Sequence, residues 1–427
     1  MHTEALYDLF LTCDKVNTDS RKITDNCMFF ALKGENFDGN QYAINALDNG
    51  ASFAVIDDAS LADEPKCIFV DDTLKSLQEL ANHHRHQLKA KLIALTGSNG
   101  KTTTKELIYR VLSTKFKTQC TQGNFNNHIG VPLTLLSIKE DTEFAIVEMG
   151  ANHLKEIELL CNIADPDYGY ITNFGKAHLE GFGSIEGVIK GKSELYDHLK
   201  NKGKFIFVNA RDPKQVELTS AYDKCIEFNK ANGSGLDSQF ISADPFVRFD
   251  IDGESVESQL TGFYNFHNIS VAVAIGKYFE VSNENIKSAI SNYSPENNRS
   301  QIIERDAQKI ILDAYNANPT SMKAALDNFD QMSSSGKVAV LGDMFELGDF
   351  ALTEHQAIAD YALGLSIDQL WLVGENFFGI NTADSRCKTF RTYKDLEAFW
   401  TEHQSSYNTF LIKGSRGMAL ERLLNSE

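Results

Sequence analysis

The residues with the clearest chemical potential form a short glycine-rich stretch, TGSNGKTTTKE, at positions 96–106. The common phosphate-binding loop has the pattern G-x-x-x-x-G-K-[ST]. Gly100, Lys101 and Thr102 supply the end of that pattern, but the preceding glycine, Gly97, stands only three residues before Gly100. The stretch is a shortened nucleotide loop, a different loop with the same task, or an ordinary strand-to-helix turn.

We expect this loop to hold the phosphates of a nucleoside triphosphate. Backbone N–H groups in such a turn converge on one point, and the helix N-terminus adds positive potential there. Lys101 can reach the outer phosphates, and the hydroxyl of Thr102 or Thr103 can bind magnesium. Gly97 and Gly100 carry no Cβ where a phosphate must approach. An ordinary turn rarely combines a strand, G-x-x-G-K-T and a helix, so the nucleotide interpretation is favoured.

Two further polar residues follow predicted strands. Glu148 ends the run FAIVE, and His178 follows the run YGYITN within FGKAHLE. Sites in α/β proteins are built at the carboxyl ends of strands, where a carboxylate and an imidazole could bind a divalent metal. Alternatively, Glu148 caps the next helix and His178 is a hydrogen-bonded structural residue. Both interpretations are open at this point, and the edge that Glu148 and His178 share with Lys101 favours the metal site.

Two strand-end motifs near the C-terminus carry polar side chains. In DAYNANPTSM, Asp313 could hold a ribose hydroxyl pair, and Asn316 and Asn318 could bond an amide-rich substrate. The same motif also predicts an Asx-turn in which a proline starts a helix, and both interpretations can hold together.

The second motif, LIKGSRGM, places Lys413, Ser415 and Arg416 in a glycine turn. Two cations at a helix N-terminus suit a carboxylate or a phosphate. A solvated basic turn explains the same residues equally well.

The elements that position these residues follow an alternating strand and helix rhythm, which predicts an α/β protein with parallel sheets covered by helices. In the helix after the glycine loop, Leu107, Ile108, Val111 and Leu112 share one face. The stretch at about 220–260 is polar, and we interpret it as edge strands and loops. The predicted strands are 27–32, 51–57, 91–97, 143–149, 167–173, 204–210, 309–315, 337–343, 369–375 and 409–415, and the predicted helices include 73–87, 101–115, 265–280 and three beginning near 321, 353 and 393.

The composition limits the functional class. A chain of 427 residues is too long for one ordinary core and suggests two or three domains, with boundaries near residues 87 and 295. The net charge of -18 argues against a nucleic-acid or membrane-surface partner. The seven cysteines are scattered and form no C-x-x-C pair, which favours a reduced protein. We find no signal peptide and no apolar run long enough to cross a membrane, so we expect a cytoplasmic enzyme, by default a monomer.

Taken together, the motifs resemble those of the Mur ligase family. The matching stretches are TGSNGKTTTKE, DSRKITDNCMFFALKGENFDGNQYAINALDNGA, NFNNHIGVP, EMGA, NFGKAHLEGFGS, GFYNFHN, DAYNANPTSM, LGDMFELGD and LIKGSRGM, and they cover nearly the whole chain. The resemblance implies an N-terminal UDP-substrate-binding domain (1–87), a central P-loop-type ATP-binding domain with a parallel sheet (88–294) and a C-terminal Rossmann-like domain (295–427). It also implies ATP-dependent joining of D-alanyl-D-alanine to a UDP-N-acetylmuramoyl-tripeptide, with closure of the C-terminal domain completing the site.

The resemblance assigns roles residue by residue. Catalysis would rest on Lys101, His178 and Lys192, with Lys192 as a carbamylated lysine that bridges to magnesium, although an unmodified helical lysine is the alternative. The ATP contacts would be Gly97, Ser98, Asn99, Gly100, Lys101, Thr102, Thr103, Asn265, Asn268, Arg299 and Asp313. The Mg²⁺ ligands would be Thr102, Glu148, His178 and Lys192. The substrate contacts would be Arg21, Asn126, Asn127, Asn316, Asn318, Lys413, Ser415 and Arg416, of which the last three would receive the dipeptide. Tyr264 stands where the family usually has histidine.

Three other functions remain as alternatives. A diamino-acid-adding ligase of the same family would carry a DNPR-like motif, where this chain has DAYNANP. A folylpolyglutamate synthase would lack the N-terminal DSR and DGN stretches. A non-catalytic nucleotide-binding scaffold would not need Glu148, His178 and Lys192 together. Meso-diaminopimelate and lysine are the candidates for the third residue of the tripeptide, and no residue in the sequence decides between them.

Overall fold

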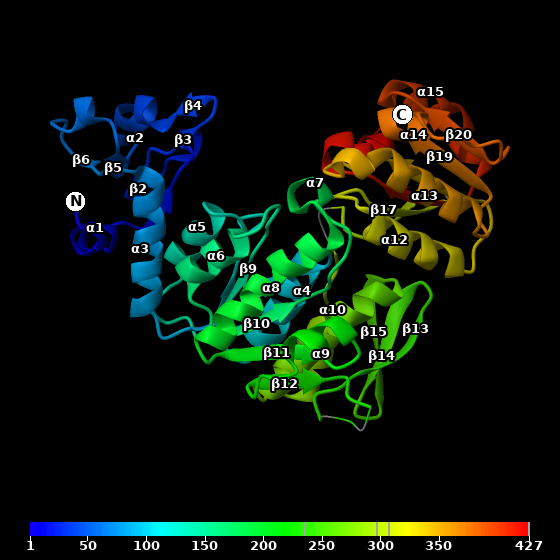
Figure 1. Cartoon of the computed structure of the whole chain (residues 1–427), viewed down its shortest axis with the longest axis horizontal. Helices are drawn as coiled ribbons and strands as arrows, with labels where there is room; N and C mark the ends of the chain where they lie inside the picture. The colour runs from blue at the N-terminus through cyan, green and yellow to red at the C-terminus, as the bar shows by residue number, and fades with distance from the viewer. Residues whose placement is uncertain (232, 234, 296–297, 306–307, 426–427) are drawn as a thin grey trace.

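The computed structural model describes residues 1–427 except 232, 234, 296–297, 306–307 and 426–427. The molecule is elongated, with the N-terminal part at one end, the C-terminal part at the other and a central part between them (Figure 1). Each part is built around its own sheet. Within the described residues, no helix combines the length and the apolar character needed to span a membrane.

The N-terminal part contains a four-stranded parallel sheet in the order β1-β2-β5-β6 and a small two-stranded sheet, β3-β4. Strand β2 is buried along its whole length, as expected for a strand covered on both faces. The strands are β1 (Lys15–Asn17), β2 (Cys27–Phe30), β3 (Lys33–Gly34), β4 (Phe37–Asp38), β5 (Ala51–Ile56) and β6 (Cys67–Phe69), and the helices are α1 (Thr3–Phe10), α2 (Ala43–Asp48) and α3 (Thr73–Gln87).

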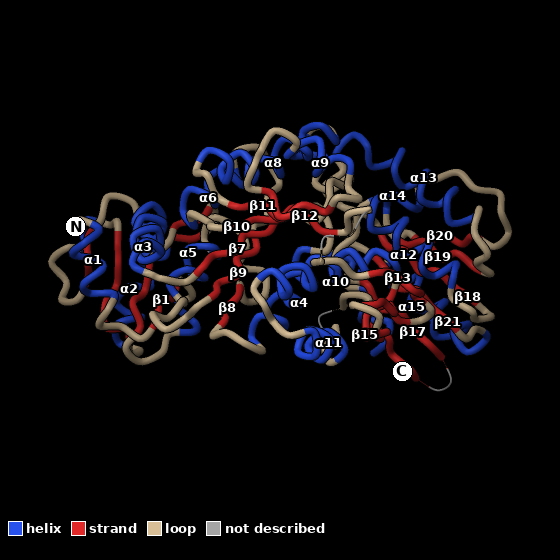
Figure 2. The backbone as a smooth tube through the Cα atoms, turned by 90° about the horizontal axis from the view of Figure 1, so that it is seen from below, coloured by secondary structure: helices blue, strands red, loops and turns tan. Residues whose placement is uncertain are grey.

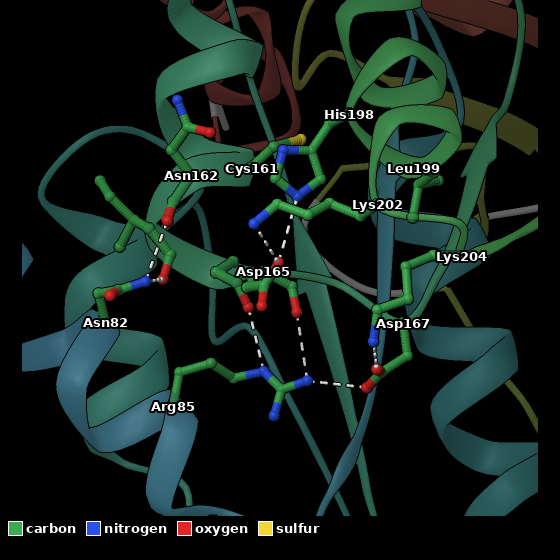
Figure 3. Close-up of polar contacts among 12 residues, drawn as sticks. Asn82, Arg85, Cys161, Asn162, Asp165, Asp167, His198, Leu199, Lys202 and Lys204 are labelled. Atoms are coloured by element: carbon green, nitrogen blue, oxygen red, sulfur yellow. Dashed lines mark hydrogen bonds and ion pairs between the residues drawn. The ribbon is translucent and has the colours of Figure 1, made fainter.

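Helix α3 joins the N-terminal part to the central part. It begins at Asp72, whose carboxylate accepts the Lys75 N–H, and it packs against α1 and against α5 and α6. Near its end, Arg85 donates to the carbonyl oxygens of Ala164 and Asp165 and to the carboxylate of Asp167 at 2.7 Å (Figure 3). One buried guanidinium therefore ties three residues of the central part to α3.

The central part is built on a six-stranded sheet in the order β12-β11-β10-β7-β9-β8, and every neighbouring pair is parallel. Helices cover both faces, with α4, α10 and α11 on one side and α6, α8 and α9 on the other (Figure 2). The strands are β7 (Lys91–Thr96), β8 (Thr118–Cys120), β9 (Phe144–Glu148), β10 (Tyr168–Ile171), β11 (Phe205–Asn209) and β12 (Cys225–Phe228). The helices are α4 (Lys101–Ser113), α5 (Gly130–Leu136), α6 (Glu156–Ala164), α7 (Leu179–Phe182), α8 (Ile185–Asn201), α9 (Pro213–Thr219), α10 (Phe263–Tyr278) and α11 (Asn283–Ser291).

The polar stretch at 220–260 forms more structure than the sequence predicted. Strand β12 completes the parallel sheet, and the rest forms a separate antiparallel sheet of β13 (Gln239–Ala243), β14 (Phe246–Ile251) and β15 (Glu254–Thr261). Val247, Phe249 and Ile251 alternate along β14 and are buried in the core shared with α10. The alternation of Arg248 and Asp250 with these residues is the period of two of a half-buried strand, which the overall polar composition of the stretch had led us to overlook.

The C-terminal part contains a six-stranded sheet in the order β16-β17-β21-β18-β19-β20, in which only the β16–β17 pair is antiparallel. The strands are β16 (Gln301–Arg305), β17 (Gln308–Asp313), β18 (Lys337–Gly342), β19 (Gln369–Val373), β20 (Cys387–Phe390) and β21 (Thr409–Lys413), and the helices are α12 (Pro319–Gln331), α13 (Ala351–Leu363), α14 (Glu375–Phe378) and α15 (Tyr393–His403). The α/β class predicted from the sequence is confirmed, including the buried face of α4 formed by Leu107, Ile108, Val111 and Leu112.

Candidate active site between the central and C-terminal parts

A cavity of about 690 Å³ lies between the central and C-terminal parts. Part of its wall comes from the loops at the carboxyl ends of parallel strands, which is where open α/β sheets bind ligands, and part from helices such as α10. Of the residues predicted to act, it is lined by Ser98, Asn99, Gly100, Lys101, Thr102, Thr103, Asn126, Asn127, Glu148, His178, Asn265, Asn268, Arg299, Asp313, Asn316, Asn318 and Lys413.

The glycine-rich loop connects β7 directly to α4, and both of its glycines are required by their surroundings. Gly97 has φ 141°, and a Cβ there would lie 2.0 Å from Thr172 Oγ1. Gly100 has φ 78° at the N-cap of α4, and a Cβ there would lie 2.6 Å from Asn268 Oδ1. The short loop therefore fits tightly against β10 and α10, with its open side toward the cavity.

Lys101, the first residue of α4, folds back over its own loop. Its Nζ donates to the carbonyl oxygens of Gly97 at 2.8 Å and Ser98 at 3.3 Å. Burial lowers the pKa of Lys101, Glu148 partly opposes this shift, and Arg299 adds to it. The ammonium is therefore held close to the loop that a phosphate would enter, in surroundings that make an anionic ligand favourable.

Glu148 ends β9 and is 2% exposed. Its Oε1 accepts from Asn126 Nδ2 at 2.8 Å, and its backbone N–H donates to Thr121 Oγ1 at 3.0 Å. Its Oε2 is buried and, among the described residues, has no hydrogen-bond partner. A buried carboxylate oxygen left in this state at a cavity wall is suited to bind a cation.

The cavity residues fit a magnesium ion. The described residues contain no cluster of three or more His, Cys, Asp and Glu side chains that could hold a metal. Mg²⁺ is usually bound by one or two carboxylates together with phosphates and water, so such a cluster is not needed. The unpartnered Oε2 of Glu148 and the hydroxyls of Thr102 and Thr103 line the same cavity.

His178 lies at the start of α7 and has a left-handed backbone, with φ 53°. Its Nδ1 lies 2.5 Å from Glu346 Oε2, so the predicted metal ligand already contacts a carboxylate of the C-terminal part. Its side chain is 20% exposed and lines the cavity.

Lys192 lies behind the cavity wall on α8 and is fully buried. Its Nζ donates to the Ala151 carbonyl oxygen at 2.9 Å and lies 5.1 Å from the centre of the Phe182 ring. Burial sets the pKa of Lys192 well below its ordinary value, and the nearby charge of Lys101 lowers it further. This favours a neutral amine, which is the form that reacts with CO₂.

Asn265 and Asn268 form a chain of hydrogen bonds from β15 through α10 to α4, the helix that follows the glycine-rich loop. Asn265 Nδ2 donates to the Thr261 carbonyl oxygen, and Asn268 Nδ2 donates to Asn265 Oδ1, both at 2.8 Å. Asn268 Oδ1 accepts from Thr104 Oγ1 at 3.0 Å. Tyr264 also lines the cavity. Its hydroxyl lies 2.7 Å from the Oγ of Ser300, a residue near the start of the C-terminal part.

On the side of the cavity formed by the C-terminal part, several of the predicted site residues contact one another. Asp313 and Lys413 are register partners at the ends of β17 and β21, and Lys413 Nζ lies 2.5 Å from Asp313 Oδ2. Lys413 also donates to the Asn316 carbonyl oxygen at 3.2 Å. The Arg299 guanidinium lies 3.6 Å from the centre of the Tyr315 ring.

Asn318 links the two walls. It is the N-cap of α12 in a capping box with Ser321, as the Asn-Pro-Thr sequence predicted. Its Nδ2 also donates to Asn99 Oδ1 of the glycine-rich loop at 2.7 Å. The helix start and the contact with the opposite wall therefore depend on the same side chain.

Five predicted residues do not line the cavity, namely Gly97, Lys192, Arg21, Ser415 and Arg416. Arg21 is exposed on the N-terminal part and is paired with Asp19. Ser415 is buried, and its Oγ accepts from the Phe345 N–H at 2.8 Å. Arg416 is 61% exposed and paired with Glu421.

Several residues that line the cavity were not predicted from the sequence. They include Asn124, His128, Gly150, Asn152, Glu156, Asn173, Tyr315 and Thr320. Most stand within the motifs already singled out or just after a predicted strand. Their position after a predicted strand could therefore have identified them as candidate site residues. Their side-chain types alone gave no such signal.

Comparisons with known proteins agree on one family. Residues 13–85 match the family model described as "Mur ligase family, catalytic domain", residues 95–276 match "Mur ligase middle domain", and residues 298–416 match "Mur ligase, glutamate ligase domain". The chain is 37% identical to the UDP-N-acetylmuramoyl-tripeptide–D-alanyl-D-alanine ligase of Bacillus subtilis (strain 168), covering 96% of this chain and 92% of the relative. It is 34% identical to the ligase of that name from Escherichia coli (strain K12), with 97% and 94% covered. A crystal structure of MurF from Acinetobacter baumannii superposes with a TM-score of 0.88 at 31% identity, covering 99% of this chain and 97% of that one.

Proposed function

The chain belongs to the Mur ligase family, and we propose that it is an ATP-dependent ligase that joins D-alanyl-D-alanine to UDP-N-acetylmuramoyl-tripeptide. One observation carries the proposal within the structure. The glycine-rich loop of the central part and the DAYNANPTS segment of the C-terminal part face each other across a single cavity. We further propose that residues 1–87, 88–294 and 295–427 act as three domains, for the UDP end of the substrate, ATP and the dipeptide respectively.

The proposed reaction begins with activation of the tripeptide carboxylate. A carboxylate does not react with an amine at neutral pH, because oxide would have to leave. Transfer of the γ-phosphoryl group of ATP to a carboxylate oxygen forms an acyl phosphate and releases ADP. The amine of the dipeptide then attacks the acyl carbon, and the tetrahedral intermediate loses phosphate and a proton to leave the amide.

Phosphoryl transfer between anions depends on positioning and on positive charge. Lys101 would leave the carbonyl oxygens of its own loop to contact the β- and γ-phosphates, which the N–H groups of 97–103 would also hold. Asn265, Asn268, Arg299 and Asp313 would contact the rest of the nucleotide. Support comes from their shared cavity and from the ring contact that holds Arg299 in place.

We propose that Mg²⁺ is held by Thr102, Glu148 and His178, with a carbamate on Lys192 close by. When bound, the metal neutralises charge on the transferring phosphoryl group. Asn126 orients the Glu148 carboxylate through Oε1, which leaves Oε2 for the metal. The lowered pKa of Lys192 supports its modification. Mass spectrometry with trapping of labelled CO₂ tests this directly.

Further residues, some of them outside the cavity, are proposed to contact the substrates. Arg416 is an exposed cation whose guanidinium lies 5.9 Å from the ring centre of Tyr315, a residue that lines the cavity, and it suits the free carboxylate of the dipeptide. Ser415 and Lys413 belong to the same glycine turn. Asn127 and Asn126 would contact the peptide of the precursor, together with Asn316 and Asn318, and Arg21 its UDP end. All seven cysteines are unpaired, which supports a reducing compartment such as the cytoplasm.

The decisive experiment measures phosphate release by the purified protein with ATP, Mg²⁺, D-alanyl-D-alanine and UDP-muramoyl tripeptides carrying either meso-diaminopimelate or lysine. We expect release that requires both the dipeptide and one tripeptide, with an amide product of the summed mass. Release with a dipeptide precursor and a single amino acid would instead identify a diamino-acid-adding ligase. Absence of release with every pair would overturn the ligase proposal.

A further inference from the structure

The contact between His178 and Glu346 crosses from the central part to the C-terminal part. Helix α7, which His178 begins, lies beside the C-terminal part (Figure 1). Glu346 stands in the loop after β18, where its own backbone is left-handed with φ 61°. The Glu180 N–H donates to the Glu346 carbonyl oxygen at 3.1 Å, so both the backbone and the side chain of Glu346 contact this segment.

This contact decides which nitrogen of His178 is left for a ligand. The Nδ1 atom lies 2.5 Å from Glu346 Oε2, so a metal would have to be bound by the other ring nitrogen, Nε2. Histidines that bind metals usually donate their second ring N–H to a carboxylate or carbonyl, which fixes the tautomer and the ring orientation.

We propose that Glu346 is a positioning residue for the metal site, supplied by the C-terminal domain, so that His178 is oriented for Mg²⁺ only while that domain is docked. The inference rests on the proposed function. It implies that the central domain binds the metal weakly when the C-terminal domain is not docked. The same loop also donates the Phe345 N–H to Ser415 Oγ at 2.8 Å. The segment that orients His178 is therefore bonded to a residue proposed to receive the dipeptide.

The test compares Glu346→Ala with Glu354→Ala. Glu354 is a matched control because its Oε1 lies 2.5 Å from Lys176 Nζ, a second ion pair across the same boundary that does not involve His178. Binding of Mn²⁺, followed by its electron paramagnetic resonance signal, is measured with an ATP analogue that cannot transfer its γ-phosphate. We expect Glu346→Ala to weaken Mn²⁺ binding about 10- to 100-fold, whereas Glu354→Ala leaves it unchanged.

A double variant separates orientation from general docking. In a His178→Ala background, adding Glu346→Ala should have no further effect on Mn²⁺ binding, because the ligand that Glu346 orients is already gone. Equal weakening by Glu346→Ala and Glu354→Ala, or no weakening by Glu346→Ala, would overturn the inference. Ligation by the wild-type protein is measured separately at saturating Mg²⁺, so a failure of the ligase proposal is seen independently of the Mn²⁺ comparison.

Discussion

At the scale of single residues, the site contains buried charged groups that lower the stability of the fold. Glu148 has a buried carboxylate oxygen without a partner among the described residues, and Lys101 is placed where burial lowers its pKa. Such groups cost folding free energy because their charged forms lose hydration. Removing them should therefore damage activity far more than stability.

Replacement of Lys101 by methionine tests this separation. We expect the rate of phosphate release to fall about 10²- to 10³-fold, because an electrostatic contact to the transferring group is lost. The melting temperature of the ligand-free protein should not fall, because the lysine is a cation whose charged form burial disfavours. Phosphate release and thermal unfolding measure the two effects.

Lys105, one helical turn later, is the contrasting control. It is fully buried, and its Nζ donates to the Thr121 carbonyl oxygen at 2.5 Å and pairs with Glu106 at 2.9 Å. Lys105→Met should lower the melting temperature, because it leaves the buried carbonyl oxygen unpaired. An equal drop for Lys101→Met would contradict the functional interpretation of the first lysine.

At the scale of elements, three helix ends do more than begin or end a helix. Asn318 caps α12 and also bonds Asn99 across the cavity. The C-terminal end of α3 carries Arg85 into the central part, while Asp165, at the end of α6, lies close to His198 and Lys202 (Figure 3). His86 Nε2 also lies 3.2 Å from Asp165 Oδ2. The positions of these ends are therefore set by contacts between parts of the molecule.

Asn318→Ala should cost about 1 kcal/mol of stability through the lost N-cap. It should also raise the KM for ATP, because the bond to the glycine-rich loop disappears. Thr392→Ala is the matched control, since Thr392 forms a capping box with Asp395 at α15, outside the cavity lining. Denaturant unfolding should show a similar loss of stability in both variants. Steady-state kinetics should show a higher KM for ATP in Asn318→Ala alone. A KM change in both variants would refute this assignment.

Asp165→Asn should destabilise the protein at pH 7 by about 1 kcal/mol, as for a partly exposed charge network. Burial raises the pKa of Asp165, but Lys202, His198 and His86 outweigh it, so the net pKa is lowered. A lowered carboxyl pKa contributes stability above the unfolded value, 3.8, and loses it as the pH falls below that value. The difference between wild type and variant in chemical unfolding should therefore vanish in acid.

Asp141→Asn provides the comparison for the acid experiment. Asp141 also has a lowered pKa, chiefly from its hydrogen bond with Lys117, but this pair is exposed on both sides. Its replacement should change stability less than that of Asp165. A larger loss for Asp141→Asn, or a loss for Asp165→Asn that persists unchanged in acid, would show that the network around Asp165 contributes little.

At the scale of the whole molecule, the two boundaries differ. The N-terminal part is tied to the central part by α3, which packs along α5 and α6. The C-terminal part meets the central part around the cavity, through contacts such as Asn318 with Asn99 and Lys176 with Glu354. A boundary that encloses an open cavity is expected to allow relative domain motion.

Small-angle X-ray scattering should therefore show compaction when the ATP analogue and the tripeptide precursor are added together. The physical reason is that bound ligand bridges the two cavity walls and excludes water between them. The Asn318→Ala variant should compact less, because one of the bridging contacts is missing. An unchanged radius of gyration in the wild-type protein would argue against closure as a step of the reaction.

The sequence by itself determined the local elements and the kind of chemistry. Continuous apolar runs predicted the strands β7, β9, β10 and β11, and the glycine spacing before Lys101 predicted the nucleotide loop, because both signals act between near neighbours in the chain. The Asn-Pro pair likewise predicted the start of α12. The stretch at 220–260 was interpreted as edge strands and loops, but neither the separate antiparallel sheet nor its burial against α10 was predicted, because pairing between strands and packing on a helix are long-range contacts.

Only the tertiary structure decided which of these residues meet. It paired Asp313 with Lys413 through the register of two distant strands, and it placed Glu346 against His178 across a boundary between two parts of the molecule. It also left Arg21 exposed beside Asp19. Contacts of this kind depend on how sheets and domains pack in space, and residue type and spacing along a single chain do not contain that information.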